Sequence, residues 1–433
     1  MKTAKQLVKD SKHFCILPWI HFHAWPNKNV MPCCIADSDM PVSKIKEEET
    51  ILQMMNSEEY KKMRTAMLND EPYEACRRCY ELEENGTWTL RQSQNMVRGM
   101  DSLDIIEDTG ADGEIDEFEM KYMDIRFSNL CNYKCRSCGP GCSNLWGEEK
   151  LKMIEEHVFV TTFGEEGETK ARTLRSNNDD GKFMPKLKEH LADVEECYFA
   201  GGEILVTPEH YECVDYWIEN DLAKDVKLNY TTNMSKIKHK DKRTGERDLI
   251  EIWNNFEHVE LWASIDAIDK QGELIRKGFN WEKVKENMLE LKEKAPHVKV
   301  GVTPTVSIWN IFNYAEMFDW MYDNDFISRD MPPRLNILTY PDNASIKILP
   351  NEMRLKLIQK FKEYINKFSA HEEDVHLKND FKMLVQTLWT GKENKEKLLE
   401  FFDTNDEIDM IREENMLKTI PELQEVYEWC QRN

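Results

Sequence analysis

Residues 122–142 decide the fold of this chain and read YMDIRFSNLCNYKCRSCGPGC. The first six of them are strand-like, and Cys131, Cys135 and Cys138 follow on a loop with spacing x3 and then x2. Three thiolates at this spacing can hold three corners of a cubane iron–sulfur cluster. No fourth ligand follows at a matching spacing, so one iron would stay open to a reacting molecule.

Zinc is the competing interpretation of the same cysteines, with Cys142 as a fourth ligand. Structural zinc sites usually present paired C-x2-C knuckles that close a tetrahedron, and only one such knuckle is present here. The spacing therefore favours an iron–sulfur site.

Composition limits the class of protein. The chain has 433 residues and a formal charge of -23, which suits two or three domains with a large core. With 81 acidic against 58 basic residues, a partner bound through a phosphate backbone is not expected, so we expect no nucleic-acid partner. The apolar stretch 14–20 is too short for a signal peptide or a membrane span. We therefore expect a cytoplasmic protein with no membrane partner.

Twelve cysteines in a cytosolic chain are more often metal ligands than disulfides, because cytosolic thiols stay reduced. Most of them are grouped, at positions 33–34, 76–79 and 131–142. Cys197, Cys213 and Cys430 are isolated and are expected to be small buried hydrophobic residues.

Four regions are predicted from changes in composition. Residues 1–100 hold the first five cysteines, and residues 101–119 form an acidic linker. Residues 120–344 alternate strand-like and helix-like segments, and residues 345–433 show helical periodicity without strand signals.

The middle region predicts an α/β fold, because short apolar runs that alternate with amphipathic helices indicate a parallel sheet with helical crossovers. Strands are expected at 122–127, 196–200, 227–231, 259–265, 298–306 and 334–338, and helices at 208–220, 249–256, 281–294 and 314–324. Six such units predict a partial (β/α)6 TIM-like barrel, with its chemistry at the carboxyl ends of the strands. The charged insert at about 151–188 and the N-terminal region are both candidate lids.

Small and polar residues follow the predicted strands at this edge. Gly201, Gly202 and Glu203 come directly after the second strand, where glycines let a backbone approach a ligand closely. Thr232 and Ser264 end the third and fourth strands. Hydroxyl and carboxylate groups at one rim can bind an amino acid or a ribose. In the next loop, the guanidinium of Arg276 can pair with a carboxylate.

On these motifs the region 120–344 resembles the radical S-adenosylmethionine (SAM) superfamily. The resemblance implies that Cys131, Cys135 and Cys138 ligate a [4Fe–4S] cluster whose open iron binds SAM. It also implies that the Gly201–Glu203 turn holds the methionyl amine, while Thr232 and Ser264 contact the methionyl or ribose part. The family usually has an aromatic residue before its third cysteine, where this chain has Ser137.

The N-terminal cysteines can close a second metal site. Residues 30–33 and the stretch 68–91 resemble the cluster-binding parts of SPASM and twitch auxiliary domains, which normally follow the barrel. The resemblance implies an auxiliary [4Fe–4S] cluster, and zinc is the alternative. In register with the family turn Cys33 is preferred to Cys34, so that the expected ligands are Cys15, Cys33, Cys76 and Cys79. His21 and His23 share one face of a strand and are expected to be solvated or core residues rather than ligands.

The function predicted by the resemblance is a radical SAM enzyme. Its cluster would cleave SAM reductively to a 5′-deoxyadenosyl radical, which abstracts a hydrogen from a peptide, a protein or a small molecule. The expected partners are this substrate and an electron donor such as a flavodoxin or ferredoxin. A non-catalytic, zinc-stabilised binding or regulatory module is the alternative, and a glycyl-radical activase is a third interpretation.

Overall fold

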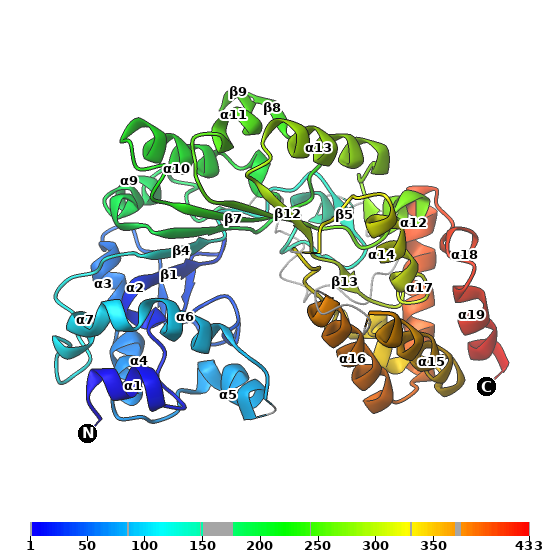
Figure 1. Ribbon diagram of the computed structural model, residues 1–433, viewed down its shortest axis with the longest axis horizontal. Helices are drawn as coiled ribbons and strands as arrows, with labels where there is room; N and C mark the ends of the chain where they lie inside the picture. Colours follow the sequence, from blue (N-terminus) through cyan, green and yellow to red (C-terminus); the bar gives the residue numbers. More distant parts are fainter. Residues whose placement is uncertain are drawn as a thin grey trace.

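Residues 2–84, 86–147, 149, 176–242, 244–329, 331–368 and 374–432 are described in this computed structural model. Most of the insert at 151–188, and with it the suggested role of that insert as a lid, lies outside the described residues. The described parts form a mixed α/β molecule, with a sheet between an N-terminal part and a group of C-terminal helices (Figure 1).

Five parallel strands lie side by side in the order in which the chain forms them. They are β4 (Tyr122–Ile125), β6 (Glu196–Phe199), β7 (Lys227–Thr232), β10 (Val259–Ala263) and β12 (Lys299–Val302). Each corresponds to a predicted strand. The predicted α/β class with its parallel sheet is therefore confirmed, and the described strands form open sheets rather than a closed barrel.

The last two predicted strands differ from the expectation. The run 298–306 is divided into β12 and a short β13 (Thr305–Val306), and β14 (Asn336–Ile337) pairs in parallel with β13 in a separate two-stranded sheet. Pro304 lies at the break, and a proline has no backbone N–H to donate to a strand ladder. The sixth predicted strand, 334–338, is found as β14, which pairs with β13 and does not join the main sheet.

The N-terminal region extends the same sheet. Strand β1 (His21–Ala24) pairs in parallel with β4, and β2 (Asn29–Met31) and β3 (Ser43–Lys44) continue it in antiparallel fashion. Residues 1–100, predicted as a domain of their own, are thus hydrogen-bonded to the first strand of the predicted barrel.

Short helices complete this N-terminal part. They are α1 (Ala4–Asp10), α2 (Leu17–Ile20), α3 (Ile51–Met55), α4 (Glu58–Leu68), η1 (Glu74–Cys76), α5 (Arg77–Glu84), α6 (Leu90–Arg98), η2 (Met100–Ser102) and α7 (Leu103–Glu107). Three of them begin at a capping box, in which a threonine and a glutamine three residues later bond reciprocally to each other's backbone. The pairs are Thr3 with Gln6, Thr50 with Gln53 and Thr89 with Gln92.

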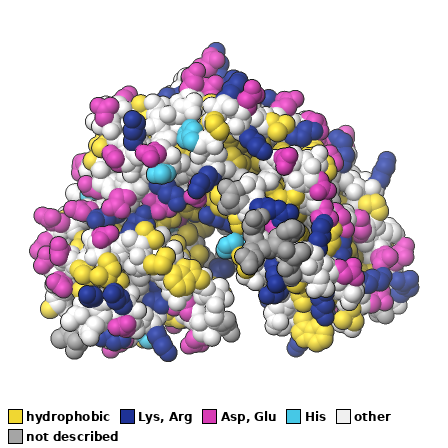
Figure 2. All heavy atoms as spheres, viewed as in Figure 1, with side chains coloured by type: hydrophobic (Ala, Val, Ile, Leu, Met, Phe, Trp, Pro, Cys, Tyr) yellow, Lys and Arg dark blue, Asp and Glu magenta, His cyan; other side chains and the backbone are white. Residues whose placement is uncertain are grey.

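Crossover helices connect the parallel strands and cover one face of the sheet (Figure 1). They include α9 (Phe183–Lys188), α10 (Pro208–Glu219), α11 (Leu249–Trp253) and α13 (Trp281–Lys294), while α14 (Tyr314–Asp323) connects β13 to β14. The predicted helix 281–294 coincides with α13. On its other face the molecule is hollowed between the N-terminal part and the C-terminal helices (Figure 2).

Smaller elements lie between and after these helices: η4 (Leu191–Asp193), η5 (Ile204–Val206), the hairpin β8 (Lys238–Asp241) and β9 (Gly245–Asp248), α12 (Asp269–Ile275), η6 (Asp342–Ala344) and η7 (Ile346–Ile348). The predicted helical C-terminus is confirmed as α15 (Asn351–Phe368), α16 (Val375–Thr390), α17 (Lys395–Arg412), α18 (Met416–Thr419) and α19 (Leu423–Arg432). Their inward residues, such as Leu384, Leu388, Leu398, Phe401 and Phe402, are buried as expected of a core. No helix among the described residues has the length and apolar character needed to cross a lipid bilayer.

Candidate cluster site

The three cysteines predicted as cluster ligands lie on one loop at the carboxyl end of β4. Cys135 belongs to β5 (Lys134–Cys135), which pairs antiparallel with β11 (Arg276–Lys277), so that Cys135 is opposite Arg276. A turn bond from the Cys138 N–H to the Cys135 carbonyl, 3.0 Å long, brings the next cysteine back. The Cys131 N–H donates to the Asn144 side chain at 2.9 Å. The loop is therefore held by hydrogen bonds at each of the three cysteines predicted as ligands.

The thiols of this loop interact with one another. Burial, followed by the neighbouring Cys135, raises the pKa of Cys131 to about 12. A hydrogen bond from the Cys138 thiol lowers the pKa of Cys135, and the same bond raises the pKa of Cys138 well above its usual range. Cys142, considered above as a zinc ligand, also contacts Cys138.

The choice between a cubane and a zinc ion at this loop rests on the spacing of its cysteines. The Cys138 thiol contacts those of Cys135 and Cys142, and one C-x2-C knuckle does not by itself close a zinc tetrahedron. Among the described residues, His21, His23 and Asp124 are the group that brings three potential ligand atoms within 4.8 Å of one another. The iron–sulfur assignment of the loop therefore stays a prediction.

The turn after β6 is pressed against the cluster loop. Gly202 has a positive φ of 51°, and a Cβ atom on it would lie 2.3 Å from the carbonyl oxygen of Leu130. The next N–H, that of Glu203, donates to this same carbonyl at 2.7 Å. Gly201 also has a positive φ, of 94°, and lies against Arg126. Only glycine allows this approach, which brings the predicted turn beside Cys131.

Glu203 connects the ends of two neighbouring strands. Its side chain is buried and accepts from the Thr232 hydroxyl at 2.7 Å and from the backbone N–H groups of Asn233 and Leu205 at 2.7 and 3.1 Å. Burial raises the pKa of Glu203, and these hydrogen bonds oppose the rise. A carboxylate offers about four acceptor sites, so three donors leave room for one more.

The rim also contains Ser264 and a buried ion pair. Ser264 is half-buried, and its N–H donates to the Thr232 carbonyl at 2.8 Å. Arg276 pairs with Asp266, with a distance of 2.8 Å between Nε and Oδ2, as predicted for a carboxylate partner. Its Nη1 lies 3.7 Å from the Cys135 sulfur, a contact that the sequence did not indicate. Although burial works against it, the Asp266 carboxylate holds the pKa of Arg276 above its usual value.

The thiols of Cys15, Cys33, Cys76 and Cys79 lie in one neighbourhood. Burial and the nearby thiols of Cys76 and Cys79 raise the pKa of Cys15, and burial with Cys34, Cys76 and Cys15 raises that of Cys33. Cys34 instead contacts the Asp124 carboxylate, and burial raises its pKa to about 12. This arrangement supports Cys33 as the ligand, while the ligand set itself stays a prediction.

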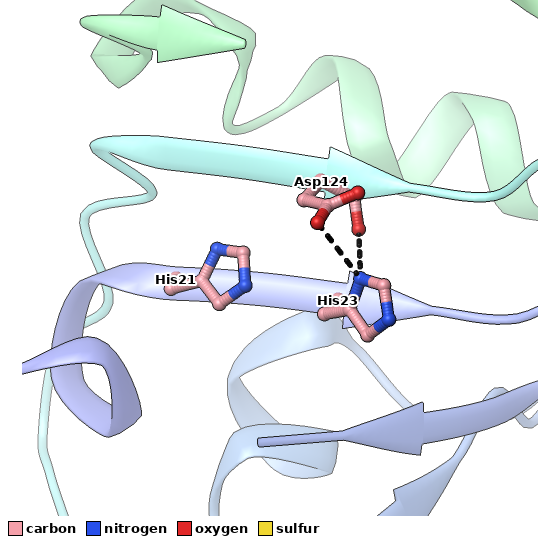
Figure 3. A group of neighbouring side chains, drawn as sticks. All are labelled: His21, His23 and Asp124. Carbon is pink, nitrogen blue, oxygen red and sulfur yellow. Dashed lines mark hydrogen bonds and ion pairs between the residues drawn. The ribbon is translucent and has the colours of Figure 1, made fainter. Parts of the chain in front are cut away.

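His21 and His23 are buried against β4 (Figure 3). The Nδ1 atoms donate to the carbonyls of Tyr122 and Asp124, at 2.8 and 2.6 Å, which holds β1 to β4. Burial lowers the pKa of His21 to about 4. The Asp124 carboxylate lies 3.4 Å from the His23 Nδ1 that already donates to a carbonyl. We therefore assign the two histidines to the core, one of the two environments expected for them.

The comparison with protein families decides the nature of the N-terminal part. Residues 15–80 match the family model of SPASM, an iron-sulfur cluster-binding domain. The matched segment contains all five N-terminal cysteines. The predicted SPASM-like region is therefore confirmed, and it lies before β4 in the chain while contributing β1, β2 and β3 to the same sheet.

Solved structures show only a low overall similarity. One, described as "Native anSMEcpe with bound AdoMet", is 18% identical with a TM-score of 0.35, covering 59% of this chain and 61% of that one. A second, of Streptococcus suis SuiB bound to S-adenosylmethionine, is 11% identical with a TM-score of 0.33, covering 71% and 62%. A third, of TYW1 with a lysine-pyruvate adduct bound, is 17% identical with a TM-score of 0.28, covering 53% and 69%. The chain thus spans about three fifths of the length of the first of these proteins. A search of curated proteins finds no match.

Sequence reasoning missed one part of the site. Helix α17 binds this part of the chain: its Asn405 and Asp409 contact Arg136 of the loop, and its Arg412 pairs with Glu149. The signal was the spacing of these residues, which places them on one face of a helix.

Proposed function

We propose that the protein is a radical SAM enzyme with an auxiliary iron–sulfur cluster in its SPASM region. The observation that carries the proposal is the contact of Gly202 with Leu130. This contact seats the Gly201–Glu203 turn against the loop of Cys131, Cys135 and Cys138. A zinc-stabilised binding module would not require the Glu203 carboxylate beside the cysteine loop.

The residues of the chain have distinct tasks in this proposal. When bound together, a reduced [4Fe–4S] cluster and SAM supply a 5′-deoxyadenosyl radical, which abstracts a hydrogen from the substrate. The three cysteines of the loop hold the cluster. Glu203 presents its remaining acceptor site to the methionyl ammonium group, and Thr232 orients Glu203 through its hydroxyl.

The proposal includes partners. A low-potential electron has to reach the cluster, which suits a small carrier such as a flavodoxin or ferredoxin. The substrate is a peptide, a protein or a small molecule that enters the hollow beneath the sheet (Figure 2). The auxiliary cluster, held by Cys15, Cys33, Cys76 and Cys79, binds this substrate or relays an electron.

Anaerobic reconstitution followed by a SAM-cleavage assay tests the proposal. Wild type should bind about eight irons per chain and form 5′-deoxyadenosine. Cys135→Ala should form none. Cys197→Ala is the matched control, because Cys197 is a fully buried cysteine within strand β6 that belongs to neither predicted ligand set, and this variant should retain activity. Formation of 5′-deoxyadenosine by Cys135→Ala, or a colourless zinc-loaded wild type, would contradict the proposal.

A further inference from the structure

Helix α17 presents one face to the cluster-binding loop. Asn405, Ile408, Asp409 and Arg412 are three or four residues apart, so they share one side of the helix. Ile408 packs on Trp146, a tryptophan whose Nε1 donates to the Cys135 carbonyl at 2.8 Å. This face thus reaches the backbone of a predicted cluster ligand.

Arg136 is the centre of the contact. It stands between Cys135 and Cys138 in the sequence, and its side chain is fully buried. Its guanidinium donates to Asn405 at 2.7 Å, to Glu414 at 2.8 Å and to Asp409. Its backbone N–H donates to the Ile275 carbonyl at 2.7 Å. One residue of the loop is therefore held by its backbone and by its side chain.

A second ion-pair group flanks the same loop. Lys134, directly before Cys135, lies 2.5 Å from Glu149, and Arg412 of α17 donates to the same carboxylate at 2.7 Å. The Arg412 guanidinium also lies over the Trp146 ring, 4.9 Å from its centroid. Both Glu149 and Arg412 are almost fully buried. Helix α17 therefore contacts the loop on both sides of Cys135, directly at Arg136 and through Glu149 at Lys134.

From these contacts we propose that α17 holds the cluster-binding loop in its ligating shape, and that Arg136 is the positioning residue for Cys135 and Cys138. The inference rests on the proposed function, because it takes these cysteines as cluster ligands. It gives helix α17 a role beyond that of a core helix.

The charges of this contact predict an effect on the cluster. The Arg136 cation is balanced by Asp409 and Glu414. Without the guanidinium, the part-buried Asp409 carboxylate loses this cation and Glu414 keeps Lys277 as its partner, and the less balanced negative charge near the loop disfavours the addition of an electron. The reduction potential should therefore fall in Arg136→Ala and rise in Asp409→Asn. Mutation of a group that hydrogen-bonds to or orients a metal ligand typically lowers metal affinity or activity by about 10- to 100-fold.

The test measures the potential of the SAM-responsive cluster in reconstituted, full-length protein. Its electron paramagnetic resonance signal is identified by its change when SAM is added, and it is titrated against potential in wild type, Arg136→Ala, Arg136→Lys and Asp409→Asn. The matched control is Arg354→Ala. Arg354 is also a buried arginine, but it donates to the carbonyls of Leu349, just before α15, and of Leu388 in α16.

Opposite shifts in the alanine and asparagine variants are expected, with the lysine variant close to wild type and the control unchanged. The kcat of SAM cleavage should fall by about 10- to 100-fold in Arg136→Ala, with less change in KM. An unmoved potential in Asp409→Asn, whose shape is conserved, would overturn the inference even if Arg136→Ala fails to fold. Absence of 5′-deoxyadenosine in wild type would instead refute the proposed function. The inference would still be tested separately, because the reduction potentials of Asp409→Asn and wild type can be compared without SAM cleavage.

Discussion

Replacing Gly202 by alanine is the sharpest single perturbation of this site. Its φ of 51° lies in the left-handed region, and an added Cβ would be 2.3 Å from the Leu130 oxygen and 3.0 Å from its carbonyl carbon. Either the Gly201–Glu203 turn or the cluster loop has to move. Both neighbours are backbone atoms, so no side-chain rotation relieves the clash.

The magnitude follows from two terms. A left-handed conformation costs an alanine about 1–2 kcal/mol. Moving the Leu130 carbonyl also sacrifices its hydrogen bond from the Glu203 N–H, which is worth about 0.5–1.5 kcal/mol. We therefore expect Gly202→Ala to destabilise the protein by about 1.5–3.5 kcal/mol.

Gly245→Ala separates the two terms. Gly245 also has a positive φ, of 73°, but nothing lies within 4 Å of its Cβ position, so it should show the conformational term alone. Urea unfolding of the reconstituted variants, with their iron content, measures the difference. Equal losses of stability in the two variants would refute the close approach of the turn to the cluster loop. Intact SAM binding in Gly202→Ala would refute its importance for the site.

Two further predictions concern single side chains. Because burial raises the pKa of Glu203, the stability that this group contributes is largest at low pH and is lost as the pH rises through its folded pKa. The thermal midpoint of wild type should therefore fall more steeply with rising pH than that of Glu203→Gln, and parallel curves would contradict the raised pKa. Cys33→Ser should lose about four irons per chain and Cys34→Ser none, because Cys33 lies near the thiols of Cys76 and Cys15, whereas Cys34 contacts the Asp124 carboxylate. If an iron assay instead shows the loss in Cys34→Ser and none in Cys33→Ser, Cys34 is the ligand and Cys33 its neighbour.

Much of the fold follows from local patterns. The helix 281–294 was predicted to the residue, since its apolar positions and its cap at Asn280 are local signals. The prediction of a single strand at 298–306 was wrong. Pro304 has no N–H for the strand ladder and interrupts the pairing, although β-branched residues lie on both sides of it. The parallel pairing of β1 with β4 could not be predicted, because the two strands are about a hundred residues apart and nothing in the pattern of β1 names its neighbour.

The candidate site divides in the same way. The sequence alone determined which groups can ligate a cluster, since Cys131, Cys135 and Cys138 lie within eight residues and their spacing limits the geometry of the loop. It also placed Gly202 and Glu203 after a strand. Only the tertiary structure decided that Glu203 bonds to Thr232 and that Arg136 bonds to Asn405, a residue 269 positions away. Such contacts depend on how buried charges find partners once the chain is packed, and no local periodicity encodes that choice.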